Sequence, residues 1–216
     1  MSINTNTIYT TSIKPFGDFI GALGLAIFLV IPFLIIWLVL YISGTRSPIF
    51  KQDRPGKNEK IFNILKFKTM TDEKDSNGVL LPDEKRTTKL GDFLRKTSLD
   101  EIPQIINILK GEMSFIGPRP LRTRYLPYYT KEESVRHSIK PGITGLAQVS
   151  GRNAINWDDK LKYDIRYLNS MSFSLDIKIL FKTFLKVFNS SEINLDMDKT
   201  SFDFDEYRKN KLKTEL

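Results

Sequence analysis

The sequence predicts an α/β protein in which an N-terminal membrane segment precedes a small soluble domain. An uncharged run from Phe19 to Ile42 is long enough to cross the hydrocarbon core of a bilayer, which is about 30 Å thick. Residues 47–70 place apolar positions around a Pro-Gly turn, as paired strands do. Residues 98–110 and 174–188 repeat apolar residues at helical spacing instead. Strands and amphipathic helices in one short chain indicate a mixed fold.

The membrane segment is expected to leave the rest of the chain in the cytoplasm. Only Lys14 and Asp18 carry charge close to its N-terminal side, whereas basic residues crowd its C-terminal side. Positive charge is retained on the cytoplasmic side of a membrane. A cleaved signal peptide matches poorly, because the run is too long and no small-x-small cleavage site follows it. The basic residues of the C-terminal side are Arg46, Lys51, Arg54 and Lys57.

Pro32 lies near the middle of the apolar run and leaves two arrangements open. A proline disfavours helical backbone at the preceding residue, Ile31, and leaves a carbonyl without its usual partner at membrane depth. One arrangement is a spanning helix with a kink. The other is a re-entrant hairpin of two half-helices, which enters and leaves the membrane by the same face. Periodicity does not separate the two.

Composition divides the chain into four expected segments. They are a flexible N-terminus, a membrane segment, a cytoplasmic domain and a polar tail, with bounds 1–14, 15–45, 46–188 and 189–216. Within the domain we expect a polar loop, a brief helix, and a glycine-rich loop or short strand, at 71–78, 90–95 and 138–152.

Asp100 and Glu101 are adjacent acids in a chain whose net charge is +8. Ser98 and Glu101 match a capping box, in which each side chain satisfies backbone N–H groups at a helix start. Pro103 is tolerated only in a first turn, so we expect the helix to begin one or two residues after Ser98 and to end before Gly111. The helix dipole then favours both carboxylates at its start. Capping and catalysis remain two interpretations of this pair.

The charge balance predicts an anionic partner. The 33 Lys and Arg residues exceed the 25 Asp and Glu residues, which suits nucleic acid, anionic lipid or a phosphorylated substrate. The absence of cysteine excludes disulfides and thiolate chemistry. The single histidine, His137, is too isolated for a metal triad and is expected to be an ordinary, partly buried side chain. Neither a Walker loop nor a GxGxxG motif appears.

The helix predicted at 174–188 has a basic edge and an apolar face. Lysines recur at positions 178, 182 and 186, and the apolar face consists of Ile177, Leu180, Phe181, Phe184 and Phe188. One interpretation is a surface helix whose lysines are solvated. The other is an interfacial helix that binds anionic lipid headgroups.

Phosphate chemistry needs fixed cations around a nucleophile, and usually a divalent metal. Basic side chains stand in short, turn-bounded segments around Asp100, at Lys66, Arg95, Arg119 and Arg152. Each alone would be an ordinary salt-bridge partner. Together with a membrane anchor, they predict a phosphorylated lipid substrate handled at the cytoplasmic face.

Three stretches of the sequence resemble the bacterial sugar transferase family, the monotopic phosphoglycosyl transferases. They read "LKFKTM", "LRKTSLDEIPQIINILKGEMSFIGPRP" and "KPGITGLAQVSGRNAINW", and the likeness covers residues from about 15 to 188. The resemblance implies transfer of a sugar-1-phosphate from a UDP-sugar to polyprenol (undecaprenyl) phosphate, with release of UMP and a need for Mg²⁺. It also implies a re-entrant helix hairpin and a small α/β catalytic domain in the cytoplasmic leaflet of the bacterial inner membrane.

The same resemblance implies roles for particular residues. Asp100 matches the nucleophile of an Asp-Glu dyad, Glu101 its metal-holding or proton-accepting partner, and both acids become Mg²⁺ ligands. The remaining matches are substrate-binding positions, at Lys66, Arg95, Arg119, Gln148 and Arg152. One departure concerns the membrane segment, because many family members have serine where this chain has Ile31 before Pro32.

The likeness also leads to expectations about the sugar that is transferred and about further partners. The compact architecture is similar to the initiating enzyme of Pgl-style N-glycosylation, which favours an N-acetylated, bacillosamine-type sugar. A galactose- or glucose-1-phosphate transferase for exopolysaccharide or capsule is the alternative. Anionic lipids and downstream glycosyltransferases are the other expected partners, and nucleic acid is not. A membrane-tethered basic adaptor without activity is the non-enzymatic alternative.

Overall fold

The apolar run forms a single helix, α1 (Lys14–Ile42), which a π-helical turn at Tyr9–Ile13 precedes. The computed structural model describes residues 7–151, 155–188 and 203–214. Within them, the helix that extends from Tyr9 to Ile42 is the one long and apolar enough to cross a membrane. Residues 7–14, expected to be flexible, are therefore mostly helical.

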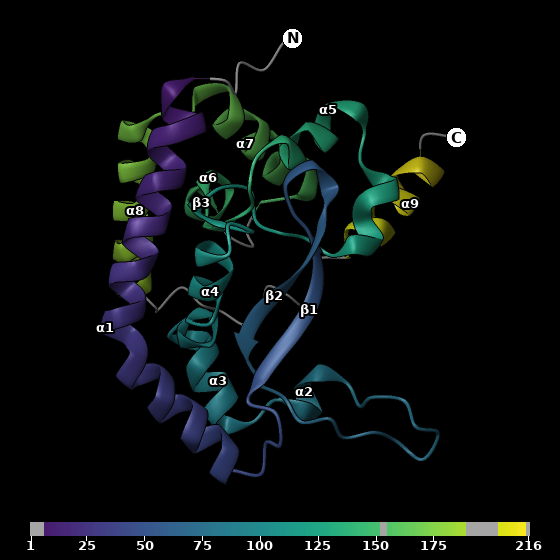
Figure 1. Cartoon of the computed structure of the whole chain (residues 1–216). Coiled ribbons are helices and arrows are strands. Elements are labelled where there is room, and N and C mark those ends of the chain that lie inside the picture. The colour runs from purple at the N-terminus through teal and green to yellow at the C-terminus, as the bar shows by residue number, and fades with distance from the viewer. Residues whose placement is uncertain (1–6, 152–154, 189–202, 215–216) are drawn as a thin grey trace.

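Pro32 lies inside α1 rather than between two separate helices. The two half-helices expected for a hairpin are thus not separate elements, although the path of α1 bends visibly in Figure 1. A proline kink explains such a bend, because the ring displaces one backbone hydrogen bond. Most of the helix surface is exposed, with Phe28 at 77% and Ile31 at 66%. An exposed apolar surface of this kind fits a helix that is associated with a membrane.

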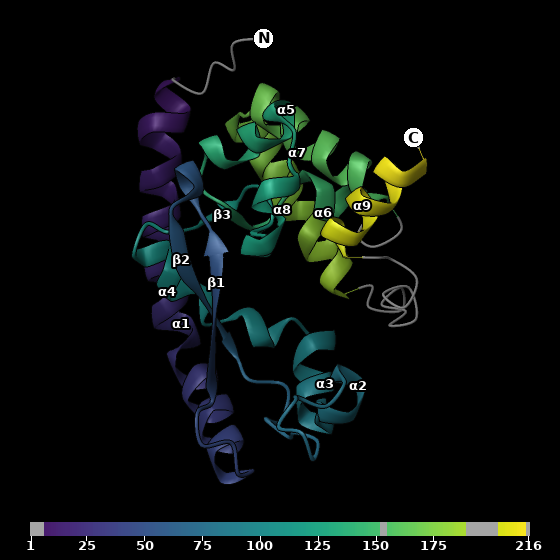
Figure 2. The ribbon, with the colours of Figure 1, turned by 90° about the vertical axis from the view of Figure 1, so that its right-hand side faces the viewer.

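Strands β1 (Ile49–Pro55) and β2 (Ile61–Phe67) form the predicted antiparallel hairpin, with Ile49 opposite Phe67 and Pro55 opposite Ile61. A short 3₁₀ turn, η2 (Lys57–Glu59), connects them. β2 is the inner strand, since Phe62 and Ile64 pack in one core cluster with Ala22 of α1. Figure 2 shows the hairpin between helices α2 and α3 at one end and the larger helical group at the other.

The chain after the hairpin forms four short elements. They are α2 (Asp83–Arg86), α3 (Lys89–Lys96), the 3₁₀ turn η3 (Leu99–Glu101) and α4 (Gln104–Leu109). The brief helix expected at 90–95 is confirmed as α3, and 71–78 is largely a loop. Leu94 of α3 and Phe67 of β2 pack against Leu40 near the end of α1.

The central part of the chain surrounds a small parallel pair of strands. β3 (Ser114–Ile116) pairs with β4 (Gly142–Thr144), as expected for a short strand within 138–152. Between them lie η4 (Thr123–Tyr128), α5 (Lys131–Ser134) and η5 (Val135–Ser138), and α6 (Leu146–Ser150) follows β4.

Three further helices complete the domain: α7 (Trp157–Ser170), α8 (Phe173–Phe188) and α9 (Phe204–Thr214). α8 confirms the amphipathic helix expected at 174–188. The polar tail expected from residue 189 differs from the structure in its last part, because α9 is folded onto the domain (Figure 1). Phe204 is fully buried among Tyr125, Trp157 and Leu161, so this part of the tail prediction is wrong. Residues 189–202 lie outside the described residues.

Candidate active site

The acidic pair occupies a tight turn before α4 rather than the first turn of a helix. Ser98 adopts a left-handed conformation with φ 57°, and Leu99–Glu101 form η3. Ser98 makes no capping hydrogen bond, and α4 begins only after Pro103, which is its N-cap residue. The expected capping box is therefore absent. Left-handed backbone at a non-glycine residue is strained, and such strain persists where the surrounding structure fixes it.

The side chains of Asp100 and Glu101 share one cation. Nζ of Lys66 lies 2.7 Å from Oε1 of Glu101 and 3.4 Å from Oδ2 of Asp100. Lys66 belongs to β2, so the hairpin brings its ammonium group to the turn from more than thirty positions earlier in the chain. Arg119 approaches Glu101 from the other side, with Nη2 3.3 Å from Oε1. Four predicted site residues thus form one cluster.

The two acids of this cluster have opposite pKa shifts. Burial raises the pKa of Asp100, which is 7% exposed, and the Lys66 ammonium opposes this effect only in part. Burial also disfavours the charged form of Glu101, but Arg119 and Lys66 outweigh it and lower the pKa of Glu101 to about 2. Glu101 is therefore a fixed anion that holds cations, and it is a poor base. Asp100 is the more basic carboxylate of the pair.

Arg95 and Gln148 do not join the cluster through contacts in the described residues. Nε of Arg95 donates to Oγ1 of Thr69 at 2.9 Å, on the segment that follows β2. Nε2 of Gln148 donates to the carbonyl oxygen of Ile143 at 3.0 Å and so braces the turn after β4. Arg152 lies outside the described residues.

A model of one protein family, described as bacterial sugar transferase, matches residues 9–190. The chain belongs to the bacterial sugar transferase family. It is 55% identical to the uncharacterized sugar transferase EpsL of Bacillus subtilis (strain 168) over 148 residues, which are 68% of this chain and 73% of that relative. Membership in a family of transferases agrees with a clustered active site and gives no support to a non-enzymatic adaptor.

Two further relatives of this sugar transferase carry the names of reactions. One is the UDP-glucose:undecaprenyl-phosphate glucose-1-phosphate transferase of Klebsiella pneumoniae, 37% identical over 76% of this chain and 38% of the relative. The other is the UDP-N-acetylgalactosamine-undecaprenyl-phosphate N-acetylgalactosaminephosphotransferase of Aeromonas hydrophila, 36% identical over 79% of this chain and 42% of the relative. The chain thus spans about two fifths of each of these longer proteins.

The donor set of the transferase suits a magnesium ion bound together with phosphate. Mg²⁺ is commonly held by one or two carboxylates, with substrate phosphates and water completing its shell. Asp100 and Glu101 supply those two carboxylates, and among the described residues no group of three or more His, Cys, Asp or Glu side chains offers a complete protein cage. The pair therefore fits a metal that arrives with a phosphorylated substrate.

Asp176 is a further structural residue of the transferase, and no motif of the sequence marks it. Its buried carboxylate accepts hydrogen bonds from Tyr9 at 2.5 Å and from Tyr167 at 2.7 Å, and it pairs with Lys14 at 2.7 Å. These contacts fasten the start of α1 to α7 and α8. An acid on the core side of an amphipathic helix is the signal that could have revealed it.

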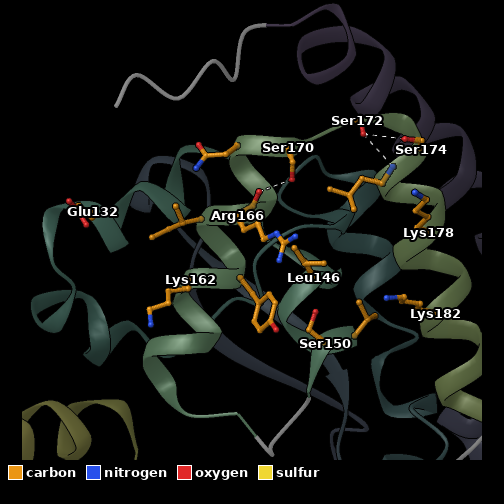
Figure 3. Close-up of a pocket in the computed structure, with 15 residues that line it drawn as sticks. Glu132, Leu146, Ser150, Lys162, Arg166, Ser170, Ser172, Ser174, Lys178 and Lys182 are labelled. Atoms are coloured by element: carbon orange, nitrogen blue, oxygen red, sulfur yellow. Dashed lines mark hydrogen bonds between the residues drawn. The ribbon is translucent and has the colours of Figure 1, made fainter.

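A broad groove of the described structure lies apart from the acidic pair. It encloses about 1040 Å³ between α6, α7 and α8, and its lining residues are drawn in Figure 3. Arg166 of α7 and Lys178 and Lys182 of α8 line it without forming an ion pair within the described residues. Beside these lysines, α8 exposes Phe181 at 63%. The combination of free cations and an exposed apolar face supports the interfacial interpretation of α8.

Proposed function

We propose that this protein transfers a sugar-1-phosphate from a UDP-sugar to polyprenol phosphate and releases UMP. The observation that carries the proposal is the buried carboxylate of Asp100, which Glu101 adjoins and the ammonium of Lys66 approaches at 3.4 Å. The printed reactions of the relatives from K. pneumoniae and A. hydrophila support the same class of donor and acceptor.

The reaction proceeds in two displacements at the sugar-bearing phosphorus. In the first, a carboxylate oxygen of Asp100 forms a bond to this phosphorus, and the bond from the phosphorus to the bridging oxygen breaks. The bridging oxygen and its electron pair leave with UMP. In the second, an oxygen of polyprenol phosphate attacks the same phosphorus, and Asp100 leaves as a free carboxylate. Burial supports the nucleophile, because the pKa of Asp100 lies above its ordinary value.

Lys66 and Arg119 reduce the repulsion between the anionic nucleophile and the anionic diphosphate. Both cations already touch Glu101, at 2.7 Å and 3.3 Å, so they need little reorganisation when the phosphate arrives. The lowered pKa of Glu101 keeps this carboxylate ionised at all moderate pH values. Its negative charge therefore holds both cations in place. Asp100 and Glu101 are the residues that would hold Mg²⁺, and a bound Mg²⁺ would neutralise part of the charge on the diphosphate.

The domain works at the cytoplasmic face of the membrane with α1 as its anchor. Basic residues after Ile42 favour the cytoplasmic side, and contacts at both ends of α1 keep the helix against the domain. The exposed face of α8 and the lysines beside it suit the interface with anionic lipids. This arrangement brings a water-soluble donor and a lipid acceptor to one site.

The donor sugar is either a hexose or an N-acetylated hexose, and no residue described here distinguishes them. The two relatives are named for glucose and for N-acetylgalactosamine, so a bacillosamine-type sugar has no particular support. Purified full-length protein, incubated with polyprenol phosphate and Mg²⁺, should release UMP from one member of a panel of UDP-sugars. Hydrolysis of the donor without polyprenol phosphate, or no UMP release with any donor, would contradict the proposal.

A further inference from the structure

Arg54 is a partly buried cation near the end of β1 that has no acidic partner. Its Nη2 donates to Oε1 of Gln52 at 2.6 Å, and its Nε atom is buried without any hydrogen bond in the described structure. No carboxylate of the described residues lies within ion-pair distance of it. Leaving a guanidinium partly desolvated and unpaired costs free energy. An unpaired arginine at this position therefore indicates a site where an anion can bind.

Two more arginines lie next to Arg54. Arg119 follows β3, and Arg122 is the N-cap residue of η4, an element that contacts β1. Burial and the positive charges of Arg119 and Arg122 together lower the pKa of Arg54 to about 10. Two segments distant in sequence, β1 and the stretch between β3 and η4, thus bring the guanidinium groups of Arg119 and Arg122 close enough to repel that of Arg54.

The carboxylates that contact Arg119 and Arg122 are shared with other cations, and none of the described residues supplies a carboxylate to Arg54. Arg119 pairs with Glu101, which Lys66 also contacts, and Nη1 of Arg122 pairs with Asp203 at 2.9 Å. Arg124 contacts Asp203 as well, so each of these carboxylates serves two cations. Arg54 therefore keeps a positive charge without a carboxylate partner, which a bound anion would neutralise.

An open groove adjoins the cluster and gives a ligand access to it. It encloses about 600 Å³ between the hairpin and the start of η4, and Gln52 and Arg122 both line it. Gln52 is also the hydrogen-bond partner of Arg54. At the far side of the cluster, Arg119 reaches Glu101 of the acidic pair. The cluster therefore extends from an open groove to the reacting carboxylates.

We propose that Arg54, together with Arg119 and Arg122, binds the diphosphate group of the nucleotide donor. The diphosphate of a UDP-sugar offers the oxygens of two linked phosphates, which three guanidinium groups can contact together, whereas a phosphate monoester offers those of one phosphate only. Guanidinium forks bind phosphate oxygens in pairs, and such charge-assisted hydrogen bonds are strong. Arg54 has a free Nε–H for this purpose, and it then positions the donor beside Asp100. The assignment rests on the function proposed above and names its donor site.

The test compares binding and stability of full-length protein in neutral detergent. Arg54→Gln should weaken UDP binding on the order of 10-fold, measured by calorimetry, while the ligand-free variant unfolds at the same or a higher temperature than wild type. The rise is expected because the substitution removes a repelled, unpaired cation. Arg46→Gln is the matched control, since it removes one exposed arginine of the same type and should change neither quantity. Arg54→Lys should restore only part of the affinity, because it keeps the charge without the fork.

Other results would overturn the assignment. Unchanged UDP affinity in Arg54→Gln would do so, as would a lower unfolding temperature of the ligand-free variant, because Arg54 would then be structural. Weakened binding of polyprenol phosphate with normal UDP binding would assign the arginines to the acceptor instead. If UDP binds in an Arg54-dependent way but no UDP-sugar is turned over, the proposed function fails and this anion site stands.

Discussion

Lys14 and Asp176 form an ion pair in which Nζ lies 2.7 Å from Oδ2, with side chains only 9% and 6% exposed. This pair ties the first residue of α1 to α8, while Leu40 near the other end of α1 packs on Phe67 and Leu94. One domain thus holds both ends of the apolar helix. A helix that carried its start to the opposite side of the membrane would have to break the ion pair.

The first prediction concerns this topology. A cysteine introduced by Thr7→Cys, two residues before the π-helical turn at Tyr9–Ile13, should resist a membrane-impermeant thiol reagent in intact cells and react after lysis. The natural chain has no cysteine, so the label reports this position alone. A cysteine in the 71–78 loop, which belongs to the catalytic domain, is the matched control and should show the same labelling. Labelling of Thr7→Cys in intact cells would instead establish a spanning helix.

The second prediction separates the two acids. Asp100→Asn should reduce turnover on the order of 1,000-fold or more, because it removes the nucleophile. Its unfolding temperature should equal or exceed that of wild type, since burial already disfavours the charged form of Asp100. Glu101→Gln should reduce turnover about 100-fold by releasing Lys66 and Arg119, yet a sugar-phosphate adduct on Asp100 should still be detectable by mass spectrometry. Near-normal turnover of Asp100→Asn would exclude the covalent route.

The third prediction tests a close backbone contact behind the site. A Cβ atom on Gly91 of α3 would lie 1.9 Å from the carbonyl oxygen of Thr69, the residue whose hydroxyl accepts from Arg95. Gly91→Ala should therefore destabilise the fold by about 1–3 kcal/mol, since the backbone must move. Gly17→Ala, where no atom lies within 4 Å, is the control and should leave the unfolding temperature unchanged or higher. Equal unfolding temperatures for both variants would show that α3 can shift freely.

The fourth prediction concerns pH. Burial and the adjacent Arg136 lower the pKa of His137 to about 4, from an ordinary value near 6.5. The unfolded chain therefore binds more protons between pH 6.5 and 4, so this contribution to stability is full at neutral pH and is lost as the pH falls through that window. The loss amounts to at most about 3 kcal/mol. Glu59 counteracts the lowering of the His137 pKa only weakly. Its Oε1 lies 3.6 Å from Nδ1 of His137, but the Glu59 side chain is half exposed.

Unfolding temperatures of wild type and His137→Gln, measured from pH 7.5 to pH 4, check this prediction. The variant should lose the part of the pH dependence that belongs to His137, while the dependence due to carboxylates remains in both proteins. Parallel curves for the two proteins across this window would show that His137 does not control acid stability.

The fifth prediction concerns the groove beside α8. The double variant Lys178→Gln and Lys182→Gln should lose most of the stabilisation that phosphatidylglycerol gives to the detergent-solubilised protein, because both lysines line the groove without an ion pair. Phosphatidylcholine should stabilise the variant and wild type equally. Lys85→Gln with Lys89→Gln removes the same charge from exposed positions elsewhere and should respond to phosphatidylglycerol as wild type does. Identical losses in both double variants would indicate a diffuse charge effect.

The sequence by itself determined the elements whose energy is local. The apolar run predicts α1, the Pro-Gly turn predicts the β1–β2 hairpin, and helical periodicity predicts α8, as the structure confirms. Motif likeness also predicted the family, which the family model confirms, whereas the catalytic role of the acidic pair stays a prediction. These signals succeed because spacing and turn chemistry act between residues that are close in the chain.

Only the tertiary structure decided how distant residues meet. Phe204 belongs to a segment whose composition predicts a polar tail, yet this segment forms a helix in which Phe204 contacts Tyr125 and Trp157. The free energy gained by burying the aromatic ring outweighs the weak helix preference of the neighbouring residues. α4 begins at Gln104, later than the sequence predicts, for a similar reason. Lys66 on β2 holds Asp100 and Glu101 in the turn that precedes this helix. The convergence of Arg54 with Arg119 and Arg122 depends on two separate segments packing together, and no periodicity in the sequence records such a contact.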